Sequence, residues 1–197
     1  MTVETSTRFS PLSEWQDTLA QLPAGLHVRE LSFLTQLTLR LQPGGPAAKA
    51  VEASLGVTLP GSLRAEIAGE VTALWMGPDE WLLVAPDGRR HDLLTQLRSA
   101  IGDEFGTVTD VSAQRTTLAL SGHLVRTVLA QGCAIDLDPR VTPAGSCLTT
   151  VLAQAPITLV VQGEATPSVW LLVRSSFASY LATWLVDACT EYRGDTG

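Results

Sequence analysis

The feature that most constrains the fold is a pair of largely apolar runs, Val71–Met76 and Trp81–Ala85, joined by the four residues 77–80. In that connection Pro78 pre-sets the first central residue of a tight turn and Asp79 suits the second, so the segment predicts a β-hairpin. Residues 74–76 and 81–83 are apolar at every position. Because successive side chains of a strand point to opposite faces, both faces of this hairpin have to be covered.

One cover for the hairpin is available nearby. From Arg89 to Ile101 the leucines recur at helical spacing, which predicts an amphipathic helix that packs on one face. The other face needs either the remainder of the chain or another protein. We expect another subunit to supply part of this cover, with the boundary at the hairpin. The predicted interface residues are Trp75, Met76, Gly77, Pro78, Asp79, Glu80 and Trp81.

The remaining pattern predicts an α+β chain. Alternating residues indicate strand over 26–41, and short apolar runs bounded by turn residues indicate strands at 106–111, 114–121, 146–153, 157–162 and 169–174. Helical spacing recurs over 47–55, which Gly56 ends, and again in a helix opened by Ser121 as its N-cap. A last amphipathic helix begins near Ser175 or Ser176.

The order of these elements repeats itself. Ala47–Pro60 corresponds in type to Leu124–Pro139, with Gly56 and Gly132 ending the two helices. The run Glu80–Val84 echoes Val169–Val173, which aligns Trp81 with Trp170. A single unit of this kind cannot bury both faces of its sheet, whereas two packed together can.

The echo therefore predicts one compact unit made of two similar α+β halves that share a core. We expect a polar N-terminal arm over residues 1–24, anchored by Trp15 and Leu19. The first half then spans residues 25–112, the second half spans 113–192, and a tail covers 193–197.

Charge and composition exclude several classes of partner. The net charge of −7 argues against a nucleic-acid backbone, and no run of lysine or arginine suggests binding to anionic lipid. The uncharged stretch 141–163 is interrupted by Pro143, Gly145 and Pro156, so it predicts two strands instead of a membrane helix. Charged residues make up only 17% of the chain, which fits either a well-filled core or a surface that faces another protein.

The start of the chain and its cysteines point to the cytoplasm. The first ten residues are polar and do not form a signal peptide. Cys133, Cys147 and Cys189 are odd in number and include no close pair. We interpret them as small buried side chains in a reducing compartment, without a disulfide framework or zinc site.

Motifs for catalysis or for cofactor binding are lacking. His27, His91 and His123 do not share metal-ligand spacing, and the chain contains no phosphate-binding loop, dinucleotide fingerprint or nucleophile elbow. The adjacent Asp79 and Glu80 lie in a turn, where a solvated pair is expected instead of an acid–base pair. The sequence thus predicts no catalytic, cofactor-binding or metal-binding residue.

Two further residues leave an alternative open. Asp110 and Arg115 flank a short turn between two predicted strands. A structural ion pair across that turn is the plain interpretation. In the alternative, Arg115 holds the carboxylate of a substrate.

Several segments together resemble the gamma subunit family of multi-subunit bacterial sarcosine oxidases, in the order of that family and from about Phe33 to Ala188. They are Trp75–Leu83, Asp110–Thr116, Leu120–Gly122, Val128–Cys133, Asp136–Pro139, Arg174–Ala178 and Trp184–Leu185. The family resembles, more distantly, the folate-binding aminomethyltransferases of the glycine cleavage system. The resemblance implies a folate-binding-domain-like fold of two α/β-sandwich halves, a tandem ferredoxin-like repeat.

The chain departs from the aminomethyltransferases at one informative place. Those enzymes carry an acidic residue at a hairpin that performs the folate chemistry, whereas this chain has Gln154-Ala155-Pro156 there. Without a carboxylate, the general acid–base step has no agent. The departure implies that the fold was kept and the site was lost.

The resemblance implies a heterotetrameric complex with alpha, beta and delta subunits. Such a complex oxidises sarcosine to glycine, with hydrogen peroxide and formaldehyde or 5,10-methylenetetrahydrofolate as the other products. FAD, FMN, NAD and tetrahydrofolate are implied on the larger subunits and zinc on a small one, with no cofactor on this chain.

Three hypotheses follow from the sequence. The first is a non-catalytic structural gamma subunit of this complex, and the absent hairpin carboxylate and low charge content favour it. The alternative is a free-standing folate-binding or aminomethyltransferase-like enzyme. A third hypothesis, an interaction module for another amine oxidase, differs from the first only in its partner.

Overall fold

A computed structural model describes residues 8–193, so residues 1–7 of the predicted arm and 194–197 of the predicted tail lie outside the described residues. The strands are β1 (His27–Leu31), β2 (Thr35–Leu41), β3 (Ala65–Ala68), β4 (Val71–Gly77), β5 (Glu80–Ala85), β6 (Gly106–Asp110), β7 (Arg115–Ser121), β8 (Cys147–Leu152), β9 (Ala155–Gly163) and β10 (Ser168–Arg174). The α-helices are α1 (Gln16–Ala20), α2 (Pro46–Leu55), α3 (Arg90–Ile101), α4 (Val125–Ala130) and α5 (Ala178–Ala188). The chain is therefore α+β, as its sequence predicts.

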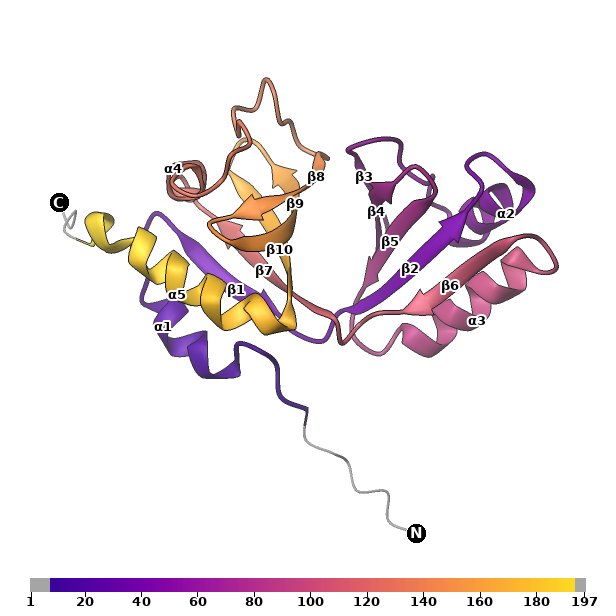
Figure 1. Cartoon of the computed structure of the whole chain (residues 1–197), viewed down its shortest axis with the longest axis horizontal. Helices are drawn as coiled ribbons and strands as arrows, with labels where there is room; N and C mark the ends of the chain where they lie inside the picture. The colour runs from indigo at the N-terminus through magenta and orange to yellow at the C-terminus, as the bar shows by residue number, and fades with distance from the viewer. Residues whose placement is uncertain (1–7, 194–197) are drawn as a thin grey trace, which may run out of the picture.

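The strands form two antiparallel five-stranded sheets. Sheet A has the order β1-β7-β10-β9-β8, and sheet B has the order β3-β4-β5-β2-β6. In Figure 1 the two sheets face each other as the arms of a V, and the helices lie on the outside. We call the face that each sheet turns toward the other its inner face, and the face that it turns toward the helices its outer face.

Each outer face packs against its own helices in a separate core. On sheet A the apolar stripes of α4 and α5 and the N-terminal Leu12, Leu19 and Leu22 are buried. On sheet B the stripes of α2 and α3 are buried against the strands. Leu19 of the N-terminal segment is 3% exposed and Trp15 packs against the same cluster, so the predicted anchors of the arm are in place.

The predicted single strand over 26–41 is wrong, because the chain turns at residues 32–34 and its two parts enter different sheets. β1 pairs with β7 of sheet A, whereas β2 pairs with β5 and β6 of sheet B. The predicted first half, residues 25–112, is therefore wrong at its start. Since no strand follows α5 within residues 8–193, the edge of β7 is completed by the N-terminal strand.

Once β1 is assigned to sheet A, the two strand orders correspond one to one. β5 and β10 occupy the same place in the two orders, which agrees with the echo between their sequences. The residue alignment within that echo is wrong. Trp81 lies in the outer core of sheet B, whereas Trp170 packs against the cluster between the sheets. Since strand side chains alternate with period two, the two strands differ by an odd shift in register.

The contact between the sheets is a smaller apolar cluster. Leu74, Leu82 and Val84 of sheet B meet side chains of sheet A there, namely Cys147, Val160 and Leu172. Both faces of the β4–β5 hairpin are thus covered within the chain. The cover that we expected from another subunit is not needed for Leu74 and Leu82, which are 0% and 1% exposed.

Backbone hydrogen bonds also join the two sheets at one edge. The amide of Ala65 donates to the carbonyl of Gly145 at 2.8 Å, and the amide of Cys147 donates to the carbonyl of Leu63 at 2.9 Å. These bonds link the start of β3 to the start of β8. The uncharged stretch 141–163 forms β8 and β9, and no described helix is long and apolar enough to cross a membrane.

Candidate functional site

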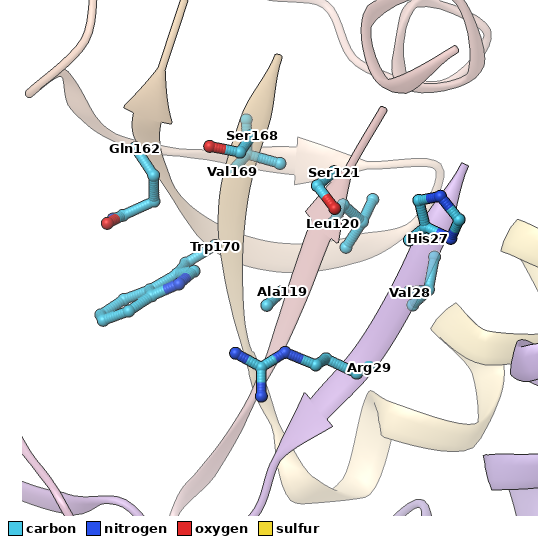
Figure 2. A pocket seen from close by; sticks show the side chains of 10 residues that line it. All are labelled: His27, Val28, Arg29, Ala119, Leu120, Ser121, Gln162, Ser168, Val169 and Trp170. Carbon is cyan, nitrogen blue, oxygen red and sulfur yellow. The ribbon is translucent and has the colours of Figure 1, made fainter. Parts of the chain in front are cut away.

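The inner face of sheet A is only partly covered by sheet B. The cluster between the sheets covers β8, β9 and part of β10, while residues 27–29 of β1 and 119–121 of β7 border a hollow on this side. Here lies a cavity of about 270 Å³, which we call the inner-face cavity (Figure 2). It is lined by His27, Val28, Arg29, Ala119, Leu120, Ser121, Gln162, Ser168, Val169 and Trp170.

The strand register brings three of these side chains to one face. Arg29 lies opposite Ala119 across β1 and β7, and Ala119 lies opposite Trp170 across β7 and β10. Directly opposite residues in antiparallel strands share a face, so Arg29 and Trp170 flank the small Ala119. Figure 2 shows the Arg29 side chain extending from β1 across β7 on the same side as Trp170.

The side chains of the inner-face cavity suit binding better than catalysis. Arg29 is exposed and makes no ion pair with any residue in 8–193, and Trp170 offers an indole face. Gln162, Ser121 and Ser168 add neutral donors and acceptors. No carboxylate or cysteine lines the cavity, so His27 is its one candidate for proton transfer and has no carboxylate partner there.

The predicted interface residues divide into buried and accessible groups. Trp81 is 4% exposed, and its Nε1 donates a hydrogen bond to the carbonyl of Pro60 at 2.9 Å. Trp75 lies directly opposite Trp81 and is half-buried. Met76 is also half-buried and packs against the cluster between the sheets. Trp81 is thus buried and hydrogen-bonded inside this chain, where a partner subunit does not reach it.

The turn of the hairpin is solvated, as its sequence predicts. Pro78 and Asp79 are exposed, and Asp79 accepts a hydrogen bond from Arg40 at 3.1 Å. Glu80 lies 3.9 Å from the same guanidinium. The hydrogen bond and charge of Asp79, together with the charge of Glu80, raise the pKa of Arg40. The two carboxylates therefore share a cation and do not form an acid–base pair.

The predicted ion pair between Asp110 and Arg115 is wrong. Asp110 instead accepts hydrogen bonds from the amide and hydroxyl of Ser112, at 3.0 and 2.6 Å, and lies 3.3 Å from Arg90. Partial burial opposes the ionisation of Asp110, but these three donors hold its pKa below the ordinary value. The short distance in sequence between Asp110 and Ser112 favours this local bond over an ion pair with Arg115.

Arg115 makes no ion pair with any residue within 8–193. Its Nη1 atom is buried and has no hydrogen-bond partner within residues 8–193. Burial lowers the pKa of Arg115, and repulsion from Arg174 lowers it further, while the more distant Glu80 acts in the opposite direction. Strand register places Arg115 directly opposite Arg174.

The histidines and cysteines form no metal site among residues 8–193. His27 lines the inner-face cavity, and His91 lies in the first turn of α3. No group of three potential metal ligands occurs among residues 8–193. Burial raises the pKa of the Cys147 thiol to about 12 and also raises that of Cys189. These two thiols are therefore poor nucleophiles in the folded chain.

Sequence reasoning did not find the inner-face cavity. Its walls combine β1 with β7, β9 and β10, which lie more than 85 residues further along the chain. The alternating pattern of β1 does predict that His27 and Arg29 share a face. No pattern among neighbouring residues predicts that β1, which carries His27 and Arg29, pairs with β7.

The chain matches the model of a family described as "Sarcosine oxidase, gamma subunit family" over residues 42–191. A sarcosine oxidase subunit gamma of Corynebacterium sp. (strain P-1) is 38% identical, over 97% of this chain and 94% of that protein. A sarcosine oxidase subunit gamma of an Arthrobacter species is 39% identical, over 98% and 95% of the two chains.

Two solved structures extend these similarities. A chain of the heterotetrameric sarcosine oxidase from Corynebacterium sp. U-96, solved in complex with pyrrole 2-carboxylate, superimposes with a TM-score of 0.88. It is 36% identical, and the match covers 96% of this chain and 98% of that one. The glycine cleavage system aminomethyltransferase T from Bartonella henselae gives a TM-score of 0.64 at 15% identity, over 92% of this chain and 49% of the enzyme. The second likeness concerns the fold alone.

Proposed function

This chain belongs to the sarcosine oxidase gamma subunit family, and we propose from that membership that it is a structural, non-catalytic subunit of a sarcosine oxidase. Such a complex takes sarcosine, dioxygen and water to glycine, hydrogen peroxide and formaldehyde. When tetrahydrofolate accepts the one-carbon unit, 5,10-methylenetetrahydrofolate forms in place of formaldehyde and no net water is consumed. The observation that carries this proposal is the TM-score of 0.88 with a chain of a heterotetrameric sarcosine oxidase, over nearly the full length of both chains.

The proposed partners are the alpha, beta and delta subunits, in the cytoplasm. FAD, FMN, NAD, tetrahydrofolate and zinc are assigned to those partners because the residues of this chain do not fit them. The sequence contains no phosphate-binding loop or dinucleotide fingerprint. Within residues 8–193 no three side chains of the types that bind zinc come together.

Three features support a non-catalytic role. The turn between β8 and β9 is Ala153-Gln154, without a carboxylate. Asp110 already accepts a hydrogen bond from Ser112 and pairs with Arg90. The inner-face cavity has no residue of carboxylate or thiol type. A chain of this kind can position other subunits, and the one proton-transfer candidate of the cavity, His27, has no carboxylate partner among the lining residues.

The architecture supports a tandem ferredoxin-like repeat as the finer description of the fold. One unit is β2-α2-β4-β5-α3-β6, with strand order β4-β5-β2-β6, and the other is β7-α4-β9-β10-α5-β1, with order β9-β10-β7-β1. β3 and β8 add one edge strand to each sheet. In this description the first half spans residues 35–112, and the second half spans residues 113–192 together with β1.

A free-standing enzyme related to the folate-binding aminomethyltransferases is the second candidate. The fold shared with aminomethyltransferase T and the open inner-face cavity favour it. The two candidates differ in what the isolated chain does. A structural subunit shows no turnover by itself, whereas the alternative requires folate-dependent transfer by the purified chain alone.

Co-expression of this chain with the three other subunits of its host tests the main proposal. We expect a tagged gamma chain to retain the alpha, beta and delta subunits through gel filtration, in equal amounts. The chain purified alone is expected to be colourless and to contain no flavin or zinc. A folded, tagged chain that retains none of the other subunits contradicts the proposal, as does stoichiometric flavin on the chain alone.

We propose the β4–β5 hairpin as part of the subunit interface, with Trp75, Met76 and the exposed turn at residues 77–80 as its accessible portion. Trp75→Asp is then expected to weaken assembly while the chain stays folded. Tyr180→Asp is the matched control, because Tyr180 is an aromatic residue that is 40% exposed on α5, a helix of the other half. Trp81 belongs to the same hairpin but is held inside the chain, so Trp81→Asp is expected to unfold it.

Circular dichroism separates the two kinds of failure. A folded Trp75→Asp chain that joins the complex at the yield of wild type removes Trp75 from the interface. The same result for Met76→Asp as well removes the hairpin. Neither result affects the assignment of the subunit, which the co-expression experiment tests.

A further inference from the structure

A second and larger hollow lies at the junction of the two halves. It encloses about 760 Å³ and is bounded by the segment before β1, the loop after β5, the start of α3 and the connection between β6 and β7. We call it the junction crevice. Its lining residues with titratable or charged side chains are Arg8, Asp87, Arg90, His91, Asp110 and Arg115.

Two of the three arginines in the junction crevice have counter-charges. Arg8 lies 2.9 Å from Asp87, and Arg90 lies 3.3 Å from Asp110. Arg115 makes no ion pair with any residue of the described chain from 8 to 193. Arg115 thus leaves one unpaired positive charge in the crevice, which the attraction of Glu80 only partly offsets, in a protein whose net charge is −7.

This uncompensated charge is unfavourable for the isolated chain. The Arg115 side chain is half-buried, with its Nη1 atom unpaired, and it lies directly opposite Arg174 in the sheet. Like charges at directly opposite positions destabilise antiparallel strands, and an unpaired charge is costly to remove from water. A carboxylate supplied from outside offsets both effects.

The rim of the junction crevice is apolar and aromatic. Phe9 is 79% exposed, and the Phe33 ring lies 4.0 Å from the Arg8 guanidinium carbon. Pro11 and Phe9 lie along the same hollow. Exposed aromatic side chains beside arginine are the composition that is enriched at the centres of protein interfaces.

We propose that the junction crevice is a docking site for an acidic side chain of a partner subunit, which pairs with Arg115 when the complex assembles. This inference rests on the proposed role as a subunit. A macromolecular partner fits better than a free carboxylate for two reasons. Only a protein surface covers the exposed Phe9, and a single arginine holds a small solvated anion weakly.

The first test compares Arg115→Gln with Arg98→Gln, which removes the charge of an exposed arginine on α3. In the isolated chain, Arg115→Gln is expected to keep or raise the melting temperature, because it removes a charge without a partner. In the complex, the same change is expected to raise the dissociation constant of the gamma chain about tenfold or more. The Arg98→Gln control changes neither quantity. A chain that loses stability alone but assembles as tightly as wild type overturns the proposal.

The second test identifies the partner group. Arg115→Lys places an amine in the crevice, and a carbodiimide then joins that amine to a carboxylate in contact with it. In the assembled complex, mass spectrometry is expected to find Lys at position 115 linked to an Asp or Glu of another subunit, with no such link for Arg98→Lys. Links to this chain alone overturn the proposal.

The remaining outcomes are equally decisive. Sodium acetate can replace sodium chloride at equal ionic strength as a probe for free carboxylates. If acetate raises the melting temperature of wild type and leaves that of Arg115→Gln unchanged, the site belongs to small carboxylates and the docking proposal fails. If the wild-type chain joins no complex at all, it is the proposed subunit role that fails.

Discussion

Trp81 of β5 and Trp170 of β10 occupy corresponding strands of the two halves, yet their side chains lie on opposite faces of their sheets. Trp81 is enclosed by helices α2 and α3 and donates a hydrogen bond to Pro60, whereas Trp170 lines the open inner-face cavity. Their sequence surroundings are alike, since both are followed by two leucines and a valine. The register of a strand decides which face a side chain takes, and it is set by pairing with distant strands.

This difference shows which side chains of each half remain accessible. The first half has Trp81 in the core, so only Trp75, Met76 and the turn of its hairpin remain accessible. The second half leaves Trp170 beside Arg29 on a face that sheet B does not cover. An accessible face and a buried core are therefore built from nearly the same sequence.

The largest expected effect separates the two tryptophans directly. Trp81→Ala removes a fully packed indole and is expected to lower the free energy of unfolding by about 3–5 kcal/mol. Trp170→Ala leaves no closed void and is expected to cost about 1–2 kcal/mol. Urea titrations of the isolated chain measure both values. Equal losses for the two variants contradict the assignment of opposite faces.

The second prediction compares two close approaches at the ends of the sheets. A Cβ on Gly122, whose φ is +122°, meets the Gly25 carbonyl oxygen at 2.2 Å, so it strikes backbone. A Cβ on Gly106 meets the end of the Leu41 side chain at 2.3 Å, and side chains can move. Gly122→Ala is therefore expected to cost about 3 kcal/mol and Gly106→Ala about 1 kcal/mol. Thermal unfolding of both variants checks the order, and a more damaging Gly106→Ala reverses it.

The third prediction concerns polarity between the sheets. Thr117 is 0% exposed, lies opposite Leu172 on the inner face, and has no hydrogen-bond partner for its hydroxyl among the described residues. Thr117→Val keeps the shape of the side chain and removes the unsatisfied group, so it is expected to stabilise the chain by about 1–2 kcal/mol. Thr38→Val, on the inner face of sheet B and half-buried, is the matched control, with a change near zero. A loss of stability in Thr117→Val indicates that the hydroxyl is bonded in solution.

The smallest expected effect is the dependence of stability on pH. The pKa of the Cys147 thiol is raised from its ordinary value of 9.0 to about 12 by burial, so the unfolded chain releases this proton at a lower pH than the folded chain does. The folded state therefore binds more protons between pH 9 and 12, and stability falls with rising pH by about 1.4 kcal/mol per unit in that window. Cys147→Ala removes this contribution, so the gap in stability between the two proteins narrows from pH 9 to pH 10. A constant gap shows that the thiol is not protected.

Local patterns in the sequence determined the elements that depend on neighbouring residues. The hairpin turn at 77–80 follows from Pro78 and Asp79, and the end of α2 follows from Gly56, which adopts a left-handed φ of 65°. The amphipathic periods of α3 and α5 likewise identify both helices and the faces that they bury. Local signals also failed in two places. α4 has Leu124 at its N-cap where Ser121 was predicted, and α4 ends at Ala130, before Gly132.

Tertiary structure alone decided which distant segments meet. Pairing with β7 drew β1 into sheet A, a choice that depends on an edge formed 85 residues later. The same long-range pairing placed Trp81 and Trp170 on opposite faces of their sheets. It also brought Arg90 within ion-pair distance of Asp110, and it left Arg115 opposite Arg174 without an ion-pair partner among the described residues. A sequence specifies which residues prefer a strand and which of them alternate. Partner, register and face are fixed only when the whole chain has folded, because each of them is a contact between residues that are far apart along it.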